Sequence, residues 1–318
     1  FCGSILAAIT AVGTIMMPKM LEQGYPRPFV IVLAASAALL EALIPPSNAA
    51  ILFSALTNVP VSQTFAAGVI PGLILLAFMV IVVLIRCRNI RNPEPASAAE
   101  RWRSFLGALP GLFTPIIILG GIYAGLLTPS ESAAVAGVWA IVMGFFIYRE
   151  LTFASLCLAL KETATITAII FAIIATATFL SVVLTYSQIP QQIVSYFTDM
   201  GATFALFWVA LAIICLLLGT FVEIVPVFYL TVPIFAAITL SFNQSLLHLY
   251  VVFVAFAGIG MITPPVCVGI YTSASVIQEN PAKAFREVPL FVGVGILYGI
   301  LMILIPEAST WLPSLLTR

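Results

Sequence analysis

Charge is scarce in this sequence of 318 residues, since only 8% of them are Asp, Glu, Lys or Arg. Soluble domains carry about 25% charged residues, so the composition excludes an ordinary water-exposed fold. Residues 204–222 contain no charge at all. The formal net charge is zero, and no basic face indicates a nucleic-acid partner.

Histidine and paired cysteines are also nearly missing. His248 is the single histidine, and the five cysteines are scattered without a CxxC pair. These absences argue against a metal cluster, a disulfide framework and a Ser/His/Asp site. No GxxxxGK[ST] loop is present to hold ATP phosphates. We therefore expect a protein that is not an enzyme and has no cofactor, and any pumping must draw on an ion gradient.

Long apolar runs fill the chain instead. The sequence is 62% hydrophobic with a mean hydropathy of +1.20, and about 20 apolar residues suffice to cross a bilayer as a helix. This pattern predicts an all-α polytopic membrane protein. Arginines cluster between residues 86 and 103, and basic residues near span ends mark the cytoplasmic side. We therefore place a cytoplasmic linker at 86–108, between two halves.

The two halves on either side of the linker have the same predicted order of elements, and the first half contains fewer of them. Residues 1–85 predict a hairpin arm, a broken helix and a final helix. Residues 109–318 predict scaffold helices at 109–185 with an amphipathic interfacial helix at 149–162. After them we expect a helical hairpin at 204–240 whose arms meet at Gly219-Thr220, a broken helix at 248–277 and a final helix at 288–305.

An internal repeat supports this division. Ala42-Leu43-Ile44-Pro45-Pro46 resembles Met261-Ile262-Thr263-Pro264-Pro265, and Gly3-Ser4 resembles Gly219-Thr220 at matching spacing. The final helix of the first copy ends at the arginine cluster, whereas its counterpart begins beside Lys283 and Arg286. Equivalent helices would then cross in opposite directions, which predicts an inverted-topology repeat of the kind found in secondary transporters.

The double prolines mark the expected sites. Two successive prolines break a helix, and backbone carbonyls freed inside a membrane need an ion, a water-lined cavity or a protein partner. Half-helix ends add partial charges that attract ions. Polar side chains follow each break: Ser47, Asn48, Ser54 and Thr57 after the first, and Thr272, Ser273 and Ser275 after the second, where Thr263 also lies at the break.

Carboxylates within apolar stretches are the other candidates. Glu223 lies between the expected hairpin arms, and Glu41 lies just before the first break. A carboxylate inside a membrane is costly and indicates function by default, although hairpin amides could also satisfy Glu223. Glu131 follows a Thr-Pro turn, and we expect Thr128 or Ser130 to cap the helix that begins there.

Several stretches resemble the large membrane subunit of tripartite ATP-independent periplasmic (TRAP) transporters. They are GSILAAITAVGTIMMPKMLEQGYPRPF at 3–29, LIPPSNAAILFSALTNVPVSQTFAAGVIPG at 43–72, GIYAGLLTPSESAAVAGVWA at 121–140 and GIGMITPPVCVGIYTSAS at 258–275. Together they span nearly the whole chain. The family's large subunit starts well before the residue matched by Phe1, so the resemblance implies that the first scaffold helices and one hairpin arm are missing here.

The resemblance implies an elevator-type transporter in the bacterial inner membrane. One sodium site would involve Gly3, Ser4, Pro45, Pro46 and Ser47. A second would involve Gly219, Thr220, Glu223, Thr263, Pro264 and Val266. Substrate would lie between them, near Asn48, Ser54, Thr272 and Ser273. Many relatives have Asp or Asn where this chain has Ala8, which weakens the expectation for the first site.

The resemblance also implies partners. They are a small membrane subunit, a periplasmic binding protein that delivers a small organic anion, and membrane lipid. The leading hypothesis is sodium-coupled uptake of a C4-dicarboxylate, keto acid or sugar acid. Two alternatives stay open: a stand-alone anion–sodium symporter or ion exchanger of related fold, and a membrane scaffold subunit that transports nothing.

Overall fold

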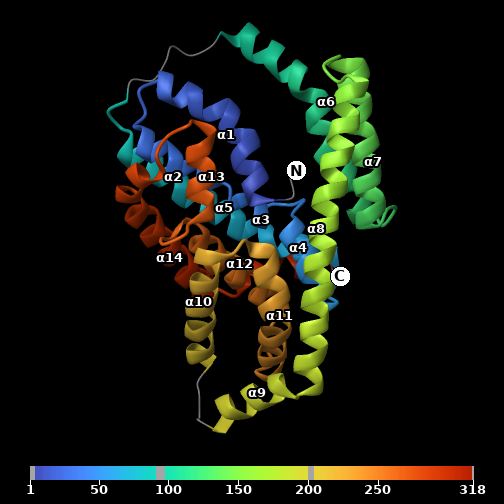
Figure 1. The fold of residues 1–318 in the computed structure, drawn as a ribbon, viewed down its shortest axis with the longest axis vertical. Helices are drawn as coiled ribbons and strands as arrows, with labels where there is room; N and C mark the ends of the chain where they lie inside the picture. The colour runs from blue at the N-terminus through green and yellow to red at the C-terminus, as the bar shows by residue number, and fades with distance from the viewer. Residues whose placement is uncertain (1–3, 91–96, 200–203, 317–318) are drawn as a thin grey trace. The chain divides into compact units, whose positions relative to one another are not determined.

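The computed structural model describes residues 4–90, 97–199 and 204–316, and every regular element in these ranges is helical (Figure 1). Residues 4–147 contain α1 (Ile5–Glu22), α2 (Arg27–Ala37), α3 (Leu40–Leu43), α4 (Asn48–Thr57), α5 (Val61–Arg86), α6 (Ala98–Tyr123), α7 (Pro129–Val142) and the π-helix η1 (Met143–Ile147). Residues 153–316 contain α8 (Phe153–Tyr186), α9 (Ile189–Asp199), α10 (Phe204–Phe221), α11 (Ile224–Ser241), α12 (Leu246–Ile262), α13 (Val268–Val276), the 3₁₀ helix η2 (Pro281–Arg286), α14 (Val288–Leu304) and α15 (Glu307–Leu316).

Many of these helices are long and apolar enough to cross a bilayer. Within the described ranges six qualify singly, namely α1, α5, α6, α7 continued by η1, α8 and α11. Counting each bent pair of helices as one span raises the number to eight. The prediction of an all-α polytopic membrane protein is therefore confirmed.

The chain forms two compact units. One comprises Phe1–Arg91 with Ala177–Arg318, and the other comprises Asn92–Thr176. The first unit is built around α12, whose residues from His248 to Ile262 are all buried. A helix that is apolar on all sides belongs in such a position, because no face of it needs water.

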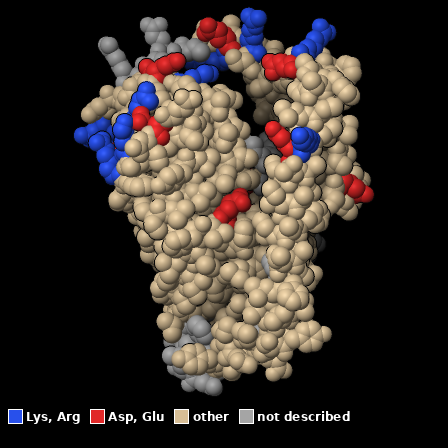
Figure 2. Space-filling model, in the orientation of Figure 1, with Lys and Arg blue, Asp and Glu red and all other residues tan. Residues whose placement is uncertain are grey.

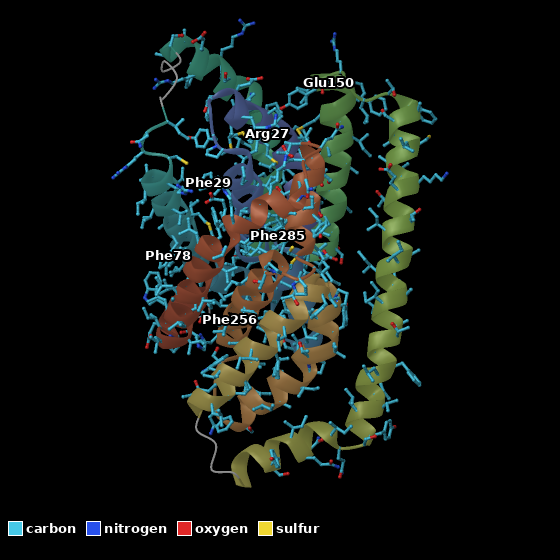
Figure 3. All side chains as sticks on the ribbon, turned by 60° about the vertical axis from the view of Figure 1, so that its left-hand side comes forward. Arg27, Phe29, Phe78, Glu150, Phe256 and Phe285 are labelled. Atoms are coloured by element: carbon cyan, nitrogen blue, oxygen red, sulfur yellow. The ribbon has the colours of Figure 1, made fainter. Side chains whose placement is uncertain are left out.

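Aromatic residues tie α14 to three other helices of the first unit. Phe29 of α2 lies 5.7 Å from Phe291 between ring centroids, and Phe78 of α5 lies 6.3 Å from Tyr298. Phe256 of α12 lies against Gly299. Figure 3 labels the three phenylalanines on their separate helices. These contacts hold the final helix 288–305, which the sequence predicts almost to the residue, against the core of the unit.

The second unit packs α6 against α7 and η1. The Trp139 indole donates a hydrogen bond to the Pro110 carbonyl at 3.1 Å, and the Tyr148 hydroxyl donates to the Gly107 carbonyl at 3.0 Å. Thr128 caps α7 as expected: its hydroxyl accepts from the Glu131 amide, and Glu131 Oε2 accepts from the Thr128 amide at 2.7 Å. This capping box stabilises the turn before α7.

Three predicted boundaries are wrong. Residues 149–162 do not form a separate interfacial helix, because the helix from Phe153 runs without a break to Tyr186. Residues 98–108, which we assigned to the linker 86–108, form the start of α6 beyond a capping box of Ser97 and Glu100. The hairpin arms do not meet at Gly219-Thr220, since α10 continues through both residues to Phe221. Helix propensity there outweighs the single glycine.

Candidate functional site at the broken helices

The first broken helix is interrupted where the double proline predicts. Helical structure ends at Leu43 and resumes at Asn48, and the segments on either side are bent by 44°. Proline lacks an amide hydrogen and clashes with the preceding turn. The Pro45-Pro46 peptide bond is cis. The predicted break is confirmed.

Protein groups already satisfy part of the backbone freed at this break. The buried Ser47 hydroxyl donates to the Ala42 carbonyl at 2.9 Å and accepts from the Ala50 amide at 3.4 Å, so it caps α4. Tyr250 of α12 also donates to the Ala42 carbonyl. Gly68 of α5 lies directly against the Leu43 carbonyl. Of the three kinds of partner expected for these carbonyls, a protein partner is the one observed at Ala42.

The second broken helix has the same form. α12 ends at Ile262 and α13 begins at Val268, and the Pro264-Pro265 peptide bond is cis. The Thr263 hydroxyl donates to the Ile259 carbonyl at 2.7 Å. Pro264, Pro265 and Val266 are exposed, whereas Cys267, the last residue before α13, is buried.

The end of α10 meets this second break. The Cys267 amide donates to the Thr220 carbonyl at 3.2 Å, while the Thr220 hydroxyl is used within its own helix, on the Leu217 carbonyl. Gly219 packs on Ala257 and Gly260 of α12 so closely that backbone meets backbone. Small residues permit such close contacts between membrane helices, so Gly219 lets α10 pack on α12, while its predicted part in a sodium site stays a prediction.

Glu223 lies at the tip between α10 and α11 and is half-buried. Its Oε1 accepts a hydrogen bond at 3.1 Å from the hydroxyl of Ser4, which precedes α1. The sequence analysis assigned these two residues to separate sodium sites, whereas the structure brings them into direct contact. Gly3, another residue of the predicted first site, lies outside the described residues.

The helices beside these tips, α1 and α11, each pack on a broken helix from a distant part of the chain. α1 packs on α13, the second half of the second broken helix, and α11 packs on α4, the second half of the first (Figure 1). The second break is thus next to α1, and the first break is next to α11. Both breaks, Ser4 and Glu223 belong to the same compact unit.

The four predicted substrate residues differ in what their side chains contact. The Ser273 hydroxyl is fully buried and donates to the Ile31 carbonyl at 2.8 Å. Ser54 is buried and donates to the Val59 carbonyl, and Thr272 donates to the Val268 carbonyl at 2.9 Å. Asn48 is half-buried in the first turn of α4. A direct role of any of them in substrate binding stays a prediction.

A cavity of about 460 Å³ adjoins the first break. Its walls come from α1, α2, α3 and the Pro45-Pro46 turn, and they include Ala8 and three methionines of α1. Glu41 is the one ionisable residue among its lining residues. Ala8 therefore contributes an apolar methyl group where the resemblance implies a polar ligand.

Tyr250 is the residue at this site that the sequence analysis missed. It is fully buried, and its bond to Ala42 links α12 directly to the first break. A buried tyrosine hydroxyl usually finds a partner, so a tyrosine inside a fully apolar helix was the available signal. The partner itself, 208 residues away in the sequence, could not be read from any local pattern.

Comparison with known proteins agrees with this architecture. Residues 1–308 match the family model described as tripartite ATP-independent periplasmic transporter, DctM component. The C4-dicarboxylate TRAP transporter large permease protein DctM of Pseudomonas aeruginosa is 34% identical, over 98% of this chain and 74% of the relative. The ectoine/5-hydroxyectoine large permease UehC of Ruegeria pomeroyi is 31% identical, with the same coverage of both chains. The sialic acid large permease SiaM of Vibrio cholerae is 28% identical, again over 98% and 74%. The chain therefore belongs to the DctM family as a TRAP transporter large permease subunit, a multi-pass protein of the bacterial inner membrane.

Proposed function

We propose that this permease carries out sodium-coupled uptake of a small organic anion. The observation that carries the proposal is the similar packing of the two breaks. The first lies next to α11 and the second next to α1, and Glu223 lies at the tip between α10 and α11. Half-helix ends and exposed backbone suit ion coordination inside a membrane. Relatives are named for C4-dicarboxylates, ectoines and sialic acid, so the fold is compatible with several substrates. We favour a C4-dicarboxylate, keto acid or sugar acid.

We assign the sodium ions to the two breaks and their neighbouring tips. One set of ligands would be Ser4 and the segment Pro45, Pro46 and Ser47, with Gly3. The other would be Thr220, Glu223, Thr263, Pro264 and Val266, with Gly219. The Ser4–Glu223 hydrogen bond supports a coupled arrangement, in which occupation of one set alters the other. Substrate would lie between them, near Asn48 and Thr272.

We further propose that the chain is an inverted repeat working as an elevator. The segments α1–α5 and α11–α14 have the same order of arm, broken helix and final helix. The compact unit that contains both breaks would be the moving part, and Asn92–Thr176 would belong to the scaffold. A small membrane subunit and a periplasmic binding protein would complete the tripartite system that the family name describes.

Uptake into proteoliposomes tests this function. The permease, reconstituted with its small subunit and supplied with binding protein, should accumulate a radiolabelled organic anion under an inward sodium gradient. Replacing sodium by choline at equal ionic strength should lower the initial rate at least tenfold. Equal rates in both salts would contradict sodium coupling, and uptake without any binding protein would favour a stand-alone symporter. A scaffold subunit would support no uptake that depends on residues at the breaks.

A further inference from the structure

Two arginines share one carboxylate: Arg86 ends α5 and Arg286 ends η2. Glu287, at the start of α14, is buried, and its Oε1 lies 2.8 Å from Arg86 Nη2 and 3.7 Å from Arg286 Nε. Arg86 also donates through Nε to Oε2 at 3.3 Å. Both arginine side chains are more than half exposed, whereas that of Glu287 is only 6% exposed. One buried negative charge thus faces two outward positive charges.

The other end of η2 repeats this arrangement. Glu279 accepts from Lys283 Nζ at 2.8 Å and from Arg27 Nη1 at 3.2 Å, and its side chain is 14% exposed against 63% and 58% for the two cations. The hydrogen bond from Lys283 lowers the pKa of Glu279, with smaller contributions from the Asn280 amide and from Arg27, so this carboxylate is charged at neutral pH.

Together these groups form a surface that we call the basic edge: Arg27, Arg86, Arg88, Lys283 and Arg286. Two carboxylates, Glu279 and Glu287, pair with four of these five cations, and Arg88, two residues after Arg86, is exposed. Within the unit that holds α1, α2 and α13, Figure 2 shows Lys and Arg side chains gathered at one end together with acidic side chains, and most of the remaining visible surface of that unit is uncharged. The basic edge therefore keeps an excess of positive charge that an anion can neutralise.

An exposed apolar surface adjoins the basic edge on the same helix. Val80, Ile81, Leu84 and Ile85 of α5 are between 46% and 69% exposed, in the last turns before Arg86. α5 is the most apolar of the single helices long enough to span a bilayer. Cations directly beyond a lipid-facing helix end match the shape of a phospholipid, with its phosphate at the head and its acyl chains below.

We propose that the basic edge binds the phosphate of an anionic phospholipid, whose acyl chains lie along the exposed face of α5. A free phosphate would use the cations but would gain nothing from the apolar side chains beneath them. Each basic residue near an anionic membrane surface strengthens binding roughly fivefold. This proposal concerns lipid binding and does not depend on sodium coupling.

The test measures binding of fluorescent phosphatidylglycerol and phosphatidylcholine to the purified, intact transporter in detergent micelles. The double variant Lys283→Gln/Arg286→Gln removes two cations but leaves Arg86 and Arg27 to neutralise the buried carboxylates. It should bind phosphatidylglycerol about 25-fold more weakly, at the fivefold per cation given above, with phosphatidylcholine binding unchanged. The matched control Arg103→Gln/Lys161→Gln, which removes one lysine and one arginine elsewhere, should bind as the wild type does.

Three outcomes would overturn the proposal. They are equal affinity of the wild type for the two lipids, an unchanged affinity in the Lys283→Gln/Arg286→Gln variant, and full displacement of phosphatidylglycerol by millimolar inorganic phosphate. The last would identify a free-phosphate site instead. The variant Lys283→Arg/Arg286→Lys, which keeps both charges, should restore binding; failure to restore it in a folded protein would also count against a charge-based site.

Discussion

Replacing Glu223 by Gln is expected to lower the initial rate of sodium-driven uptake by about 10- to 100-fold. The change keeps the size of the side chain but removes its negative charge at the tip between α10 and α11. A hydrogen bond to a charged group contributes about 1.5–3 kcal/mol, and one between neutral groups about 0.5–1.5 kcal/mol. Each 1.4 kcal/mol corresponds to about tenfold, so the weakened bond to Ser4 would account for about tenfold, and loss of the charge at the proposed sodium site for the rest. In the wild type, Glu223 accepts this bond from Ser4 at 3.1 Å. The measurement is proteoliposome uptake at matched protein content.

Glu131→Gln is the matched control for this variant. Glu131 also lies at the start of a helix, but its Oε2 is used within the capping box of α7. Gln supports a capping box as Glu does, so uptake should stay within about twofold of the wild type, well inside 1 kcal/mol. Similar losses in both variants would show that Glu223 has no special role in transport.

Gly219→Ala is expected to destabilise the protein by about 1–3 kcal/mol, the usual cost of overpacking a filled interior. A Cβ atom on Gly219 would lie 2.3 Å from the Ala257 carbonyl oxygen and 3.1 Å from the Gly260 Cα. Both neighbours are backbone atoms of α12, so no side chain can rotate away. α10 would have to move off α12, which would also disturb the Thr220–Cys267 hydrogen bond. A lower thermal midpoint of unfolding would report the loss.

Gly137→Ala is the control for this second variant. Gly137 is also within a helix, but a Cβ atom there would have nothing within 4 Å. Alanine favours a helix over glycine by about 1 kcal/mol, so the midpoint should stay the same or rise. Equal loss in both variants would indicate a general intolerance of alanine rather than contact between α10 and α12.

The breaks and most helix positions could be predicted because their causes are local. Consecutive prolines interrupt a helix wherever they occur, and both predicted interruptions are present. The Thr128–Glu131 cap follows from residues three apart. Apolar length alone gives the final helix at 288–305. These features need no knowledge of what lies next to them in space.

The site itself depends on contacts between distant residues, and these could not be predicted. Ser4 and Glu223 are 219 positions apart, and Tyr250 reaches Ala42 across 208. The turn between α10 and α11 was misplaced because Gly219 looks like a turn residue, whereas its use is to let α10 lie against α12. The same local residue type serves either purpose, and only the packing partner distinguishes them.

Sodium binding to the permease itself tests the account most directly. A ligand that binds only the folded state raises stability according to its concentration relative to its dissociation constant. The thermal midpoint of the purified transporter should therefore rise with sodium chloride relative to choline chloride at equal ionic strength, and Glu223→Gln should lose that rise. Equal midpoints of the wild type in the two salts, at every concentration, would contradict a sodium site at the broken helices.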